Sequence, residues 1–167
     1  MSLILSGNSG SLTVDSTAGI TFPNGSNPQA APSKVLQVVQ GNTTTATSTS
    51  STSFVATNLT ASITPLFSTS KILILISTVG TQTSSGKTAY YTIYRNSTNL
   101  ASTAFSVYDN LFSSGFCWSP VSINYLDNPS TTSSTTYTLY LSTPNSGTAY
   151  VNGDGSTATI TLMEIAQ

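Results

Sequence analysis

The stretch that decides the fold is Lys71-Ile72-Leu73-Ile74-Leu75-Ile76-Ser77-Thr78-Val79, in which five consecutive apolar residues follow one lysine. An unbroken run of isoleucine and leucine bounded by polar residues favours a buried β-strand. Successive residues of a strand face opposite sides of the sheet, and an antiparallel strand in a lone sandwich keeps one side in water. We therefore expect one face of Ile72–Val79 to lie against an opposite sheet and the other against a neighbouring copy of the chain.

Similar strand patterns recur from Lys34 to the end of the chain. No 11-residue window places apolar residues at helical spacing, whereas runs rich in β-branched and aromatic residues alternate with turn-forming clusters. This pattern predicts an all-β antiparallel β-sandwich or jelly roll. Its expected strands lie near Val35–Gln40, Ser53–Thr57, Ala61–Thr64, Ile72–Val79, Ala89–Arg95, Leu100–Val107, Phe116–Leu126, Tyr137–Ser142, Ala149–Val151 and Thr157–Ile165.

Two segments depart from this pattern. Gly41–Ser53 is nearly all threonine and serine, which suits either an extended loop or an exposed strand of stiff threonines; we favour the loop. Residues 1–33 contain three short apolar pieces separated by Gly, Asn and Ser turns and end in a proline-containing stretch. Pieces of this length are marginal on their own, so we interpret 1–33 as an extended N-terminal arm or anchor and 34–167 as the sandwich domain.

The composition excludes several classes of function. The 167 residues include four Lys and Arg, five Asp and Glu, one Cys and no His. Histidine-dependent zinc sites and Ser-His-Asp or Cys-His catalysis are therefore absent, and four scattered cations cannot follow a nucleic acid backbone. The start of the chain lacks the basic flank of a signal peptide, and the longest apolar run is far too short to cross a membrane. We expect no cofactor, no nucleic acid partner and no membrane partner.

The shortage of charge also bears on assembly. Thirty serines and thirty threonines make the surface rich in hydroxyl groups, while the chain has only three lysines. Monomeric β proteins commonly protect sheet edges with lysine, proline, bulges or inward charges. Short strands and bulges offer a second form of protection, but we favour a closed homo-oligomer that covers the edges.

The acidic residues suggest turns more than catalysis. Asn152-Gly153-Asp154-Gly155 suits either a hairpin turn or a calcium loop, and we favour the hairpin because a calcium loop needs more acids. The five acids show no spacing that indicates a glycosidase pair. Asp127-Asn128-Pro129 is typical of a turn. For Glu164 we expect an ion pair with Lys71 or Arg95, since other partners are scarce.

Aromatic side chains concentrate between Phe105 and Trp118, with Tyr108, Phe112 and Phe116 between them. Aromatic rings stack on sugars, but they also dominate ordinary cores and interfaces. We favour a core or subunit interface over a glycan platform. Cys117 is expected to be a buried small apolar residue, not a reactive thiol.

In combination, several segments resemble a module common in virion proteins of tailed bacteriophages. The resemblance covers most of the chain, and the segments that carry it are Gly19–Gly25, Lys34–Gln40, Thr52–Val55, Leu59–Pro65, Ser68–Ile74, Tyr94–Thr98, Ser122–Pro129 and Thr159–Ile165. It implies a compact trimeric jelly roll of the tumour-necrosis-factor and C1q type. It also implies a structural role in the virion, as a tail-fibre or head-fibre tip or as a capsid decoration (cement) protein, without catalytic residues. The chain lacks the long repetitive shaft of a full tail fibre.

Together these observations predict a homotrimeric virion component that binds itself and other virion proteins, the latter through residues 1–33. The candidate core or trimer-interface residues are Ile72, Leu73, Ile74, Leu75, Tyr90 and Tyr94. The alternative is a receptor-binding tail-fibre tip that recognises a host-surface glycan, with Tyr108, Phe112 and Phe116 as the candidate recognition loop.

Overall fold

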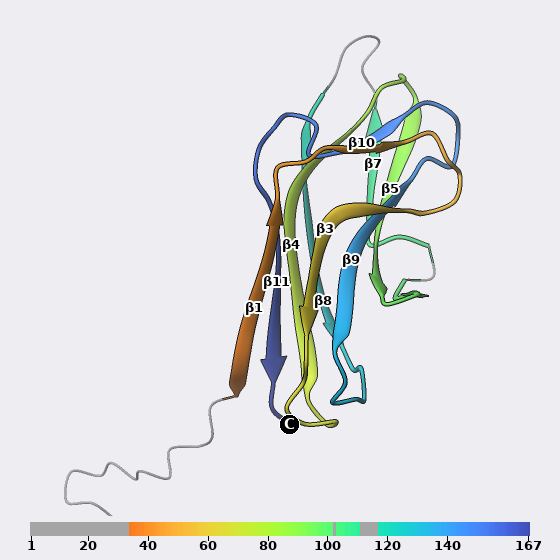
Figure 1. The fold of residues 1–167 in the computed structure, drawn as a ribbon. Coiled ribbons are helices and arrows are strands. Elements are labelled where there is room, and N and C mark those ends of the chain that lie inside the picture. Colours follow the sequence, from red (N-terminus) through yellow and green to blue (C-terminus); the bar gives the residue numbers. More distant parts are fainter. Residues whose placement is uncertain (1–33, 102, 111–116) are drawn as a thin grey trace, which may run out of the picture. The chain divides into compact units, whose positions relative to one another are not determined.

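The computed structural model describes residues 34–101, 103–110 and 117–167, which form an all-β sandwich of two antiparallel sheets (Figure 1). The sandwich fold predicted from the strand pattern is confirmed. The predicted arm at residues 1–33 lies outside the described residues. The strands are β1 (Val35–Thr43), β2 (Thr47–Thr49), β3 (Val55–Ile63), β4 (Lys71–Gln82), β5 (Lys87–Arg95), β6 (Thr98–Asn99), β7 (Ser106–Asn110), β8 (Ser119–Asp127), β9 (Thr135–Ser142), β10 (Ala149–Val151) and β11 (Ala158–Ile165).

The first sheet, sheet A, is built around β4. Its strands follow the order β1-β11-β4-β10-β2, and β8 pairs with β4 along the other edge of that strand. The lower part of sheet A is therefore a four-stranded surface with the order β1, β11, β4 and β8 (Figure 1). Sheet B has the order β3-β9-β5-β6, with β7 also paired to β5.

The core lies between the sheets and is made of alternate residues from each strand. Ile72, Ile74 and Ile76 of β4 are at most 2 % exposed, and they belong to one cluster with inward residues of β11, β8, β9 and β5. Full burial of one such side chain contributes about 1.5–3 kcal/mol. The expectation that one face of Ile72–Val79 meets an opposite sheet is therefore confirmed.

The Thr/Ser segment is more ordered than the favoured loop. β1 continues to Thr43 because Asn42 and Thr43 pair with Thr159 and Ala158 of β11, and Thr47–Thr49 pairs with β10. The exposed-strand alternative thus holds for part of Gly41–Ser53. The local sequence favoured a loop because it does not show that the distant strands β11 and β10 supply hydrogen-bond partners to this segment.

Buried amides organise the end of the sandwich where β4 meets β10, the upper end in Figure 1. The Gln82 amide group donates to Thr143 Oγ1 and Ser146 O, and its oxygen accepts from Ser84 N and Thr148 N. Asn152, also fully buried, donates to Thr43 O and accepts from Ser156 Oγ. These bonds fix the loops between strands without any charge.

The turn after β10 corrects one sequence prediction. β10 and β11 both pair with β4 and not with each other, so Asn152–Gly155 is not the turn of a hairpin. The segment still forms a tight turn, in which Ser156 N and Ser156 Oγ donate to Asp154 Oδ1. Across the described residues, no group of three His, Cys, Asp or Glu side chains could hold a metal ion. The same residues include no helix that could span a membrane.

Candidate functional site: the outer face of sheet A

The outward side of sheet A carries an apolar row that crosses four strands. The registers place Val38 of β1 opposite Met163 of β11, Met163 opposite Leu73 of β4, and Leu73 opposite Leu126 of β8. These positions alternate with the buried ones on the same strands, so they point away from the core. The four residues, Val38, Met163, Leu73 and Leu126, are called the apolar row below.

Much of the apolar row is in contact with solvent in the single chain. Val38 is 56 % exposed and Leu126 is 48 % exposed, while Met163 and Leu73 in the middle strands are half-buried. Leu75, one step further along β4, is 37 % exposed. Single exposed apolar residues are common, but an aligned set across a sheet is typical of a surface that binds a partner.

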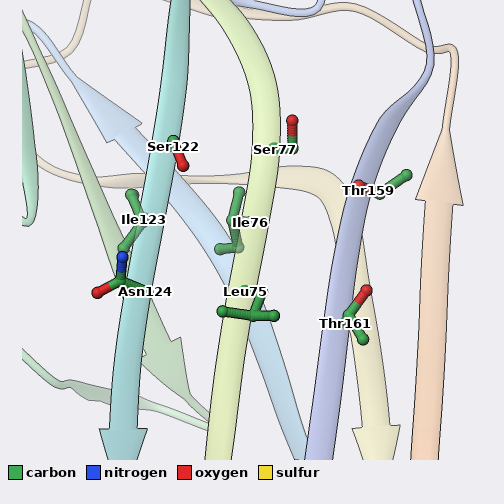
Figure 2. Close-up of a pocket in the computed structure, with 8 residues that line it drawn as sticks. All are labelled: Leu75, Ile76, Ser77, Ser122, Ile123, Asn124, Thr159 and Thr161. Carbon is green, nitrogen blue, oxygen red and sulfur yellow. The ribbon is translucent and has the colours of Figure 1, made fainter.

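A shallow depression adjoins the apolar row. It has a volume of about 260 Å³ and lies over three neighbouring strands, β8, β4 and β11 (Figure 2). Its lining comes from Leu75, Ile76, Ser77, Ser122, Ile123, Asn124, Thr159 and Thr161. Apart from Leu75 and the two isoleucines, these residues carry small hydroxyl or amide groups. The depression therefore suits neutral side chains and contains no group for acid, base or metal chemistry.

The face is nearly free of charge. Lys71 is the one charged residue among the outward residues of β1, β4, β8 and β11. It is the first residue of β4 and lies at the margin of the sheet. If another uncharged surface covered this face, no charged group would have to leave water. The desolvation of charged groups is a cost that often cancels the gain from an ion pair. The geometry therefore favours adhesion by apolar contact.

The structure divides the predicted interface residues into three places. Ile72 and Ile74 are in the core, while Leu73 and Leu75 are on the outer face of sheet A. Among the described residues, those of sheet B cover one face of β4, while Leu75 on the other face is exposed. Tyr90 and Tyr94 are half-buried on the outward side of sheet B, whereas Tyr91 between them is fully buried.

The tyrosines of sheet B form a separate aromatic group. The rings of Tyr94 and Tyr140 stack with centroids 3.9 Å apart, and Phe54 meets Tyr94 edge-on at 6.3 Å. Rings that stack on one another use their own faces in that contact. The group therefore stabilises sheet B through contacts among its own rings.

The candidate recognition loop is only partly within the described residues. Tyr108 belongs to β7, while Phe112 and Phe116 lie outside the described residues. On either side of this loop, Phe105 packs against Tyr125 at 4.8 Å and Trp118 meets Tyr150 edge-on at 6.3 Å. Phe105 is partly buried against the core, as the core interpretation predicts. Cys117 is half-buried, less than expected.

Asp127 holds the two sheets together at the end of β8. Arg95 Nη1 of β5 donates to both of its carboxylate oxygens at 2.9 Å, and Tyr137 Oη of β9 donates at 2.7 Å. Burial and the neighbouring Asp127 carboxylate raise the pKa of Tyr137 far above its ordinary value. Tyr137 thus remains a proton donor to Asp127, and the three residues form a structural clamp.

Glu164 is fully buried and does not form the expected ion pair with Lys71 or Arg95. Its carboxylate accepts hydrogen bonds from Gln37 Nε2 at 2.6 Å, Leu66 N at 2.8 Å and Phe67 N at 3.3 Å. Burial would raise the pKa of Glu164, but these hydrogen-bond donors lower it below its ordinary value. The expectation was wrong because sequence spacing does not show which backbone N–H groups a loop will present.

The two buried acids do not form a catalytic pair. Glu164 and Asp127 both lie opposite Ile72, on either side of β4, and face the core. Each carboxylate is occupied by donors from the protein itself. Asp154 is at the surface, where hydrogen bonds from Ser156 lower its pKa. These three described acids therefore have structural roles.

Three members of the apolar row were missed by the sequence analysis: Val38, Met163 and Leu126. Each is an apolar residue on the parity opposite to the buried positions of its strand, which is a signal present in the sequence. That signal becomes a surface only when the register shows that the residues are adjacent.

No family model and no curated protein matches the chain. Solved structures of VP2 from infectious bursal disease virus are similar: a VP2 mutant in derived T=1 particles (15 % identity, TM-score 0.43) and a VP2 subviral particle (16 % identity, TM-score 0.45). These matches cover 79 % and 78 % of this chain but only 37 % and 38 % of the VP2 chains.

Proposed function

We propose that this chain is a non-enzymatic structural protein of a virion, a small trimeric fibre or capsid decoration (cement) protein. It binds further copies of itself, and it docks on other virion proteins through residues 1–33. The observation that carries the proposal is the outer face of sheet A, a surface nearly free of charge with an apolar row in which Val38 and Leu126 are exposed.

The chemistry of the described residues supports a role in binding rather than in a reaction. The buried carboxylates of Glu164 and Asp127 accept hydrogen bonds from donors within the protein. The depression on sheet A is lined by hydroxyl, amide and apolar groups. A rigid sandwich with such a surface is suited to permanent contact with neighbouring subunits. The resemblance of the chain to tailed-phage virion proteins points to a virion as the setting.

A truncation tests the docking role of residues 1–33. The full chain and a chain that starts at Ser33 would be mixed with shells that lack the protein and sedimented with them. A decoration protein loses shell binding when residues 1–32 are removed, while its circular dichroism spectrum keeps the β signal. Equal shell binding by the two chains would contradict docking through this segment.

The alternative function is a receptor-binding tip that recognises a host-surface glycan. The observation that favours it is the half-buried pair Trp118 and Tyr150, next to the candidate recognition loop. In this case the chain that starts at Ser33 keeps its affinity for cells, and Trp118→Ala weakens cell binding without changing shell binding. Loss of shell binding alone, with no binding to cells by either chain, favours the decoration role.

A further inference from the structure

We infer that the loop between β3 and β4 is a second docking element, whose Leu66 and Phe67 side chains enter an apolar pocket of the virion protein to which this chain binds. The loop spans residues 64–70. The inference rests on the docking role proposed above for residues 1–33, and it adds a contact surface on the sandwich domain and the chemistry of the partner.

The loop exposes its largest apolar side chains. Leu66 is 60 % exposed and Phe67 is 57 % exposed, the two highest values among the large apolar side chains of the described residues. Ser68 and Thr69, the next two residues, are exposed as well. Single exposed apolar residues are common, whereas adjacent ones indicate a surface that binds a partner. Leu66 and Phe67 therefore form a convex apolar tip at a turn of the chain.

Hydrogen bonds hold the backbone of the tip in place. One carboxylate oxygen of the buried Glu164 accepts from Leu66 N at 2.8 Å and from Phe67 N at 3.3 Å. Ser70 N donates to Phe67 O at 3.1 Å and closes the turn. A side chain whose backbone is already fixed loses less conformational entropy on binding, and such preorganisation increases affinity. The tip is thus built as an anchor, with the aromatic ring of Phe67 as its larger contact.

The loop lies at the end of the sandwich where residues 1–33 join the domain. Gln37 of β1 donates from Nε2 to Thr64 O in the loop at 2.8 Å. Lys34, directly before β1, follows residues 1–33 in the chain. Figure 1 shows the start of β1 and the connection from β3 to β4 at the same end of the sandwich. A protein that binds residues 1–33 is therefore within reach of the loop.

The chemistry of the tip favours a protein pocket as its partner. Leu66, Phe67, Ser68 and Thr69 carry no charge, and the carboxylate that holds the tip already accepts donors of this chain. A convex apolar tip fits a concave apolar pocket, whose polar rim can pair with the hydroxyl groups of the next residues. Membrane surfaces instead attract apolar segments that carry clusters of basic residues, and this chain has four Lys and Arg in all.

Serine variants test the tip by sedimentation with shells that lack the protein. The double variant Leu66→Ser/Phe67→Ser keeps the backbone N–H groups that bind Glu164, and its shell binding is expected to be about tenfold weaker or more, as when an interface anchor is removed. Val55→Ser, at the other end of β3 and 38 % exposed, is the control and should bind like the unmodified chain. Circular dichroism verifies that both variants fold. Equal binding by the double variant and the unmodified chain overturns this inference alone, whereas no shell binding by the unmodified chain overturns the proposed docking as well.

Photo-cross-linking identifies what the tip contacts and does not depend on the folding of the serine variants. The full chain with p-benzoylphenylalanine in place of Phe67 is bound to the same shells and irradiated. A covalent adduct with a shell protein, identified by mass spectrometry, is expected. No adduct, or an adduct only with a second copy of this chain, would overturn the inference. In a parallel arm, vesicles of phosphatidylcholine and phosphatidylglycerol replace the shells, and vesicle binding that Leu66→Ser/Phe67→Ser abolishes would overturn the choice of a protein pocket.

Discussion

Glu164 shows how one buried acid can organise a loop without a cation. It joins β11 to β1 through Gln37, and to the loop after β3 through the backbone N–H groups of Leu66 and Phe67. The side chains of Leu66 and Phe67 are among the most exposed large apolar groups of the described chain. The carboxylate therefore fixes the backbone of a loop whose side chains face solvent.

We expect Glu164→Gln to destabilise the fold. The NH₂ group of the glutamine would replace one carboxylate oxygen and would face N–H groups that are themselves donors, so at least one hydrogen bond would be lost. A lost hydrogen bond at a buried site costs about 1–3 kcal/mol. The free energy of unfolding in urea measures this change, with Asp154→Asn, the same change of acid to amide at an exposed position, as the control. Equal unfolding free energies for the Glu164→Gln variant and the unmodified chain would contradict the role given to the carboxylate.

The stabilisation by Glu164 should also depend on pH. Its pKa is lowered in the folded state from an ordinary value of 4.5, so the folded protein binds this proton less readily than the unfolded chain does. The contribution is complete above pH 4.5 and is lost as the pH falls through the lowered value. The difference in melting temperature between the unmodified chain and Glu164→Gln should therefore shrink on acidification. A constant difference down to the lowest pH would show that the carboxylate charge is not involved.

At the scale of elements, β1 approaches sheet B so closely that only glycine fits at one position. A Cβ added at Gly41 would meet the backbone carbonyl of Thr60 in β3, and next the side chain of Ile160. The closest obstacle is backbone, so a rotamer change cannot relieve it. Gly41 thus permits β1 and β3 to close one side of the sandwich.

Gly41→Ala is expected to lower the free energy of unfolding by about 1–3 kcal/mol, the usual cost of overpacking. Thermal unfolding followed by circular dichroism measures the effect. Asn42→Ala is the matched neighbour, since residue 42 is exposed on the outer face and its side chain can be shortened freely. A melting temperature of Gly41→Ala equal to that of Asn42→Ala would contradict the close approach of β1 and β3.

β4 also shows how far the sequence predicts the fold and the site. Its apolar run identified a strand with two apolar faces, and the alternation in other strands predicted two antiparallel sheets. The sequence could not predict which strands border β4, because pairing depends on contacts between distant residues. For this reason Leu73 was found, but its neighbours Val38, Met163 and Leu126 were not. The partners of Glu164 were missed for the same reason.

At the scale of the whole molecule, the few basic residues make a protease a test of the domain boundary. Lys34 is exposed directly before β1, whereas Lys71, Lys87 and Arg95 lie at strand ends within the sandwich. Trypsin should therefore cut after Lys34 first and leave a stable fragment of residues 35–167, as identified by mass spectrometry. Early cleavage after Lys71 or Lys87 would contradict the boundary between arm and domain.

Association through an uncharged face should depend little on salt. Salt screens interactions between surface charges that are further apart than the Debye length, which is about 10 Å at 0.1 M and about 3 Å at 1 M. Apolar contacts are not weakened in this way. We expect the mass of the proposed trimer, measured by light scattering, to remain the same between about 0.05 and about 1 M sodium chloride. Dissociation at high salt would indicate that charged groups hold the copies together.

The polar groups that close the sandwich differ in kind between its two ends. Around Gln82 and Asn152 they are amides, which do not titrate, whereas Asp127 and Glu164 at the opposite end of β4 are carboxylates. Acidification should therefore open the molecule from one side. In hydrogen–deuterium exchange at falling pH, the amides of Leu66 and Phe67, which donate to Glu164, should lose protection first, while those around Gln82 keep it longest.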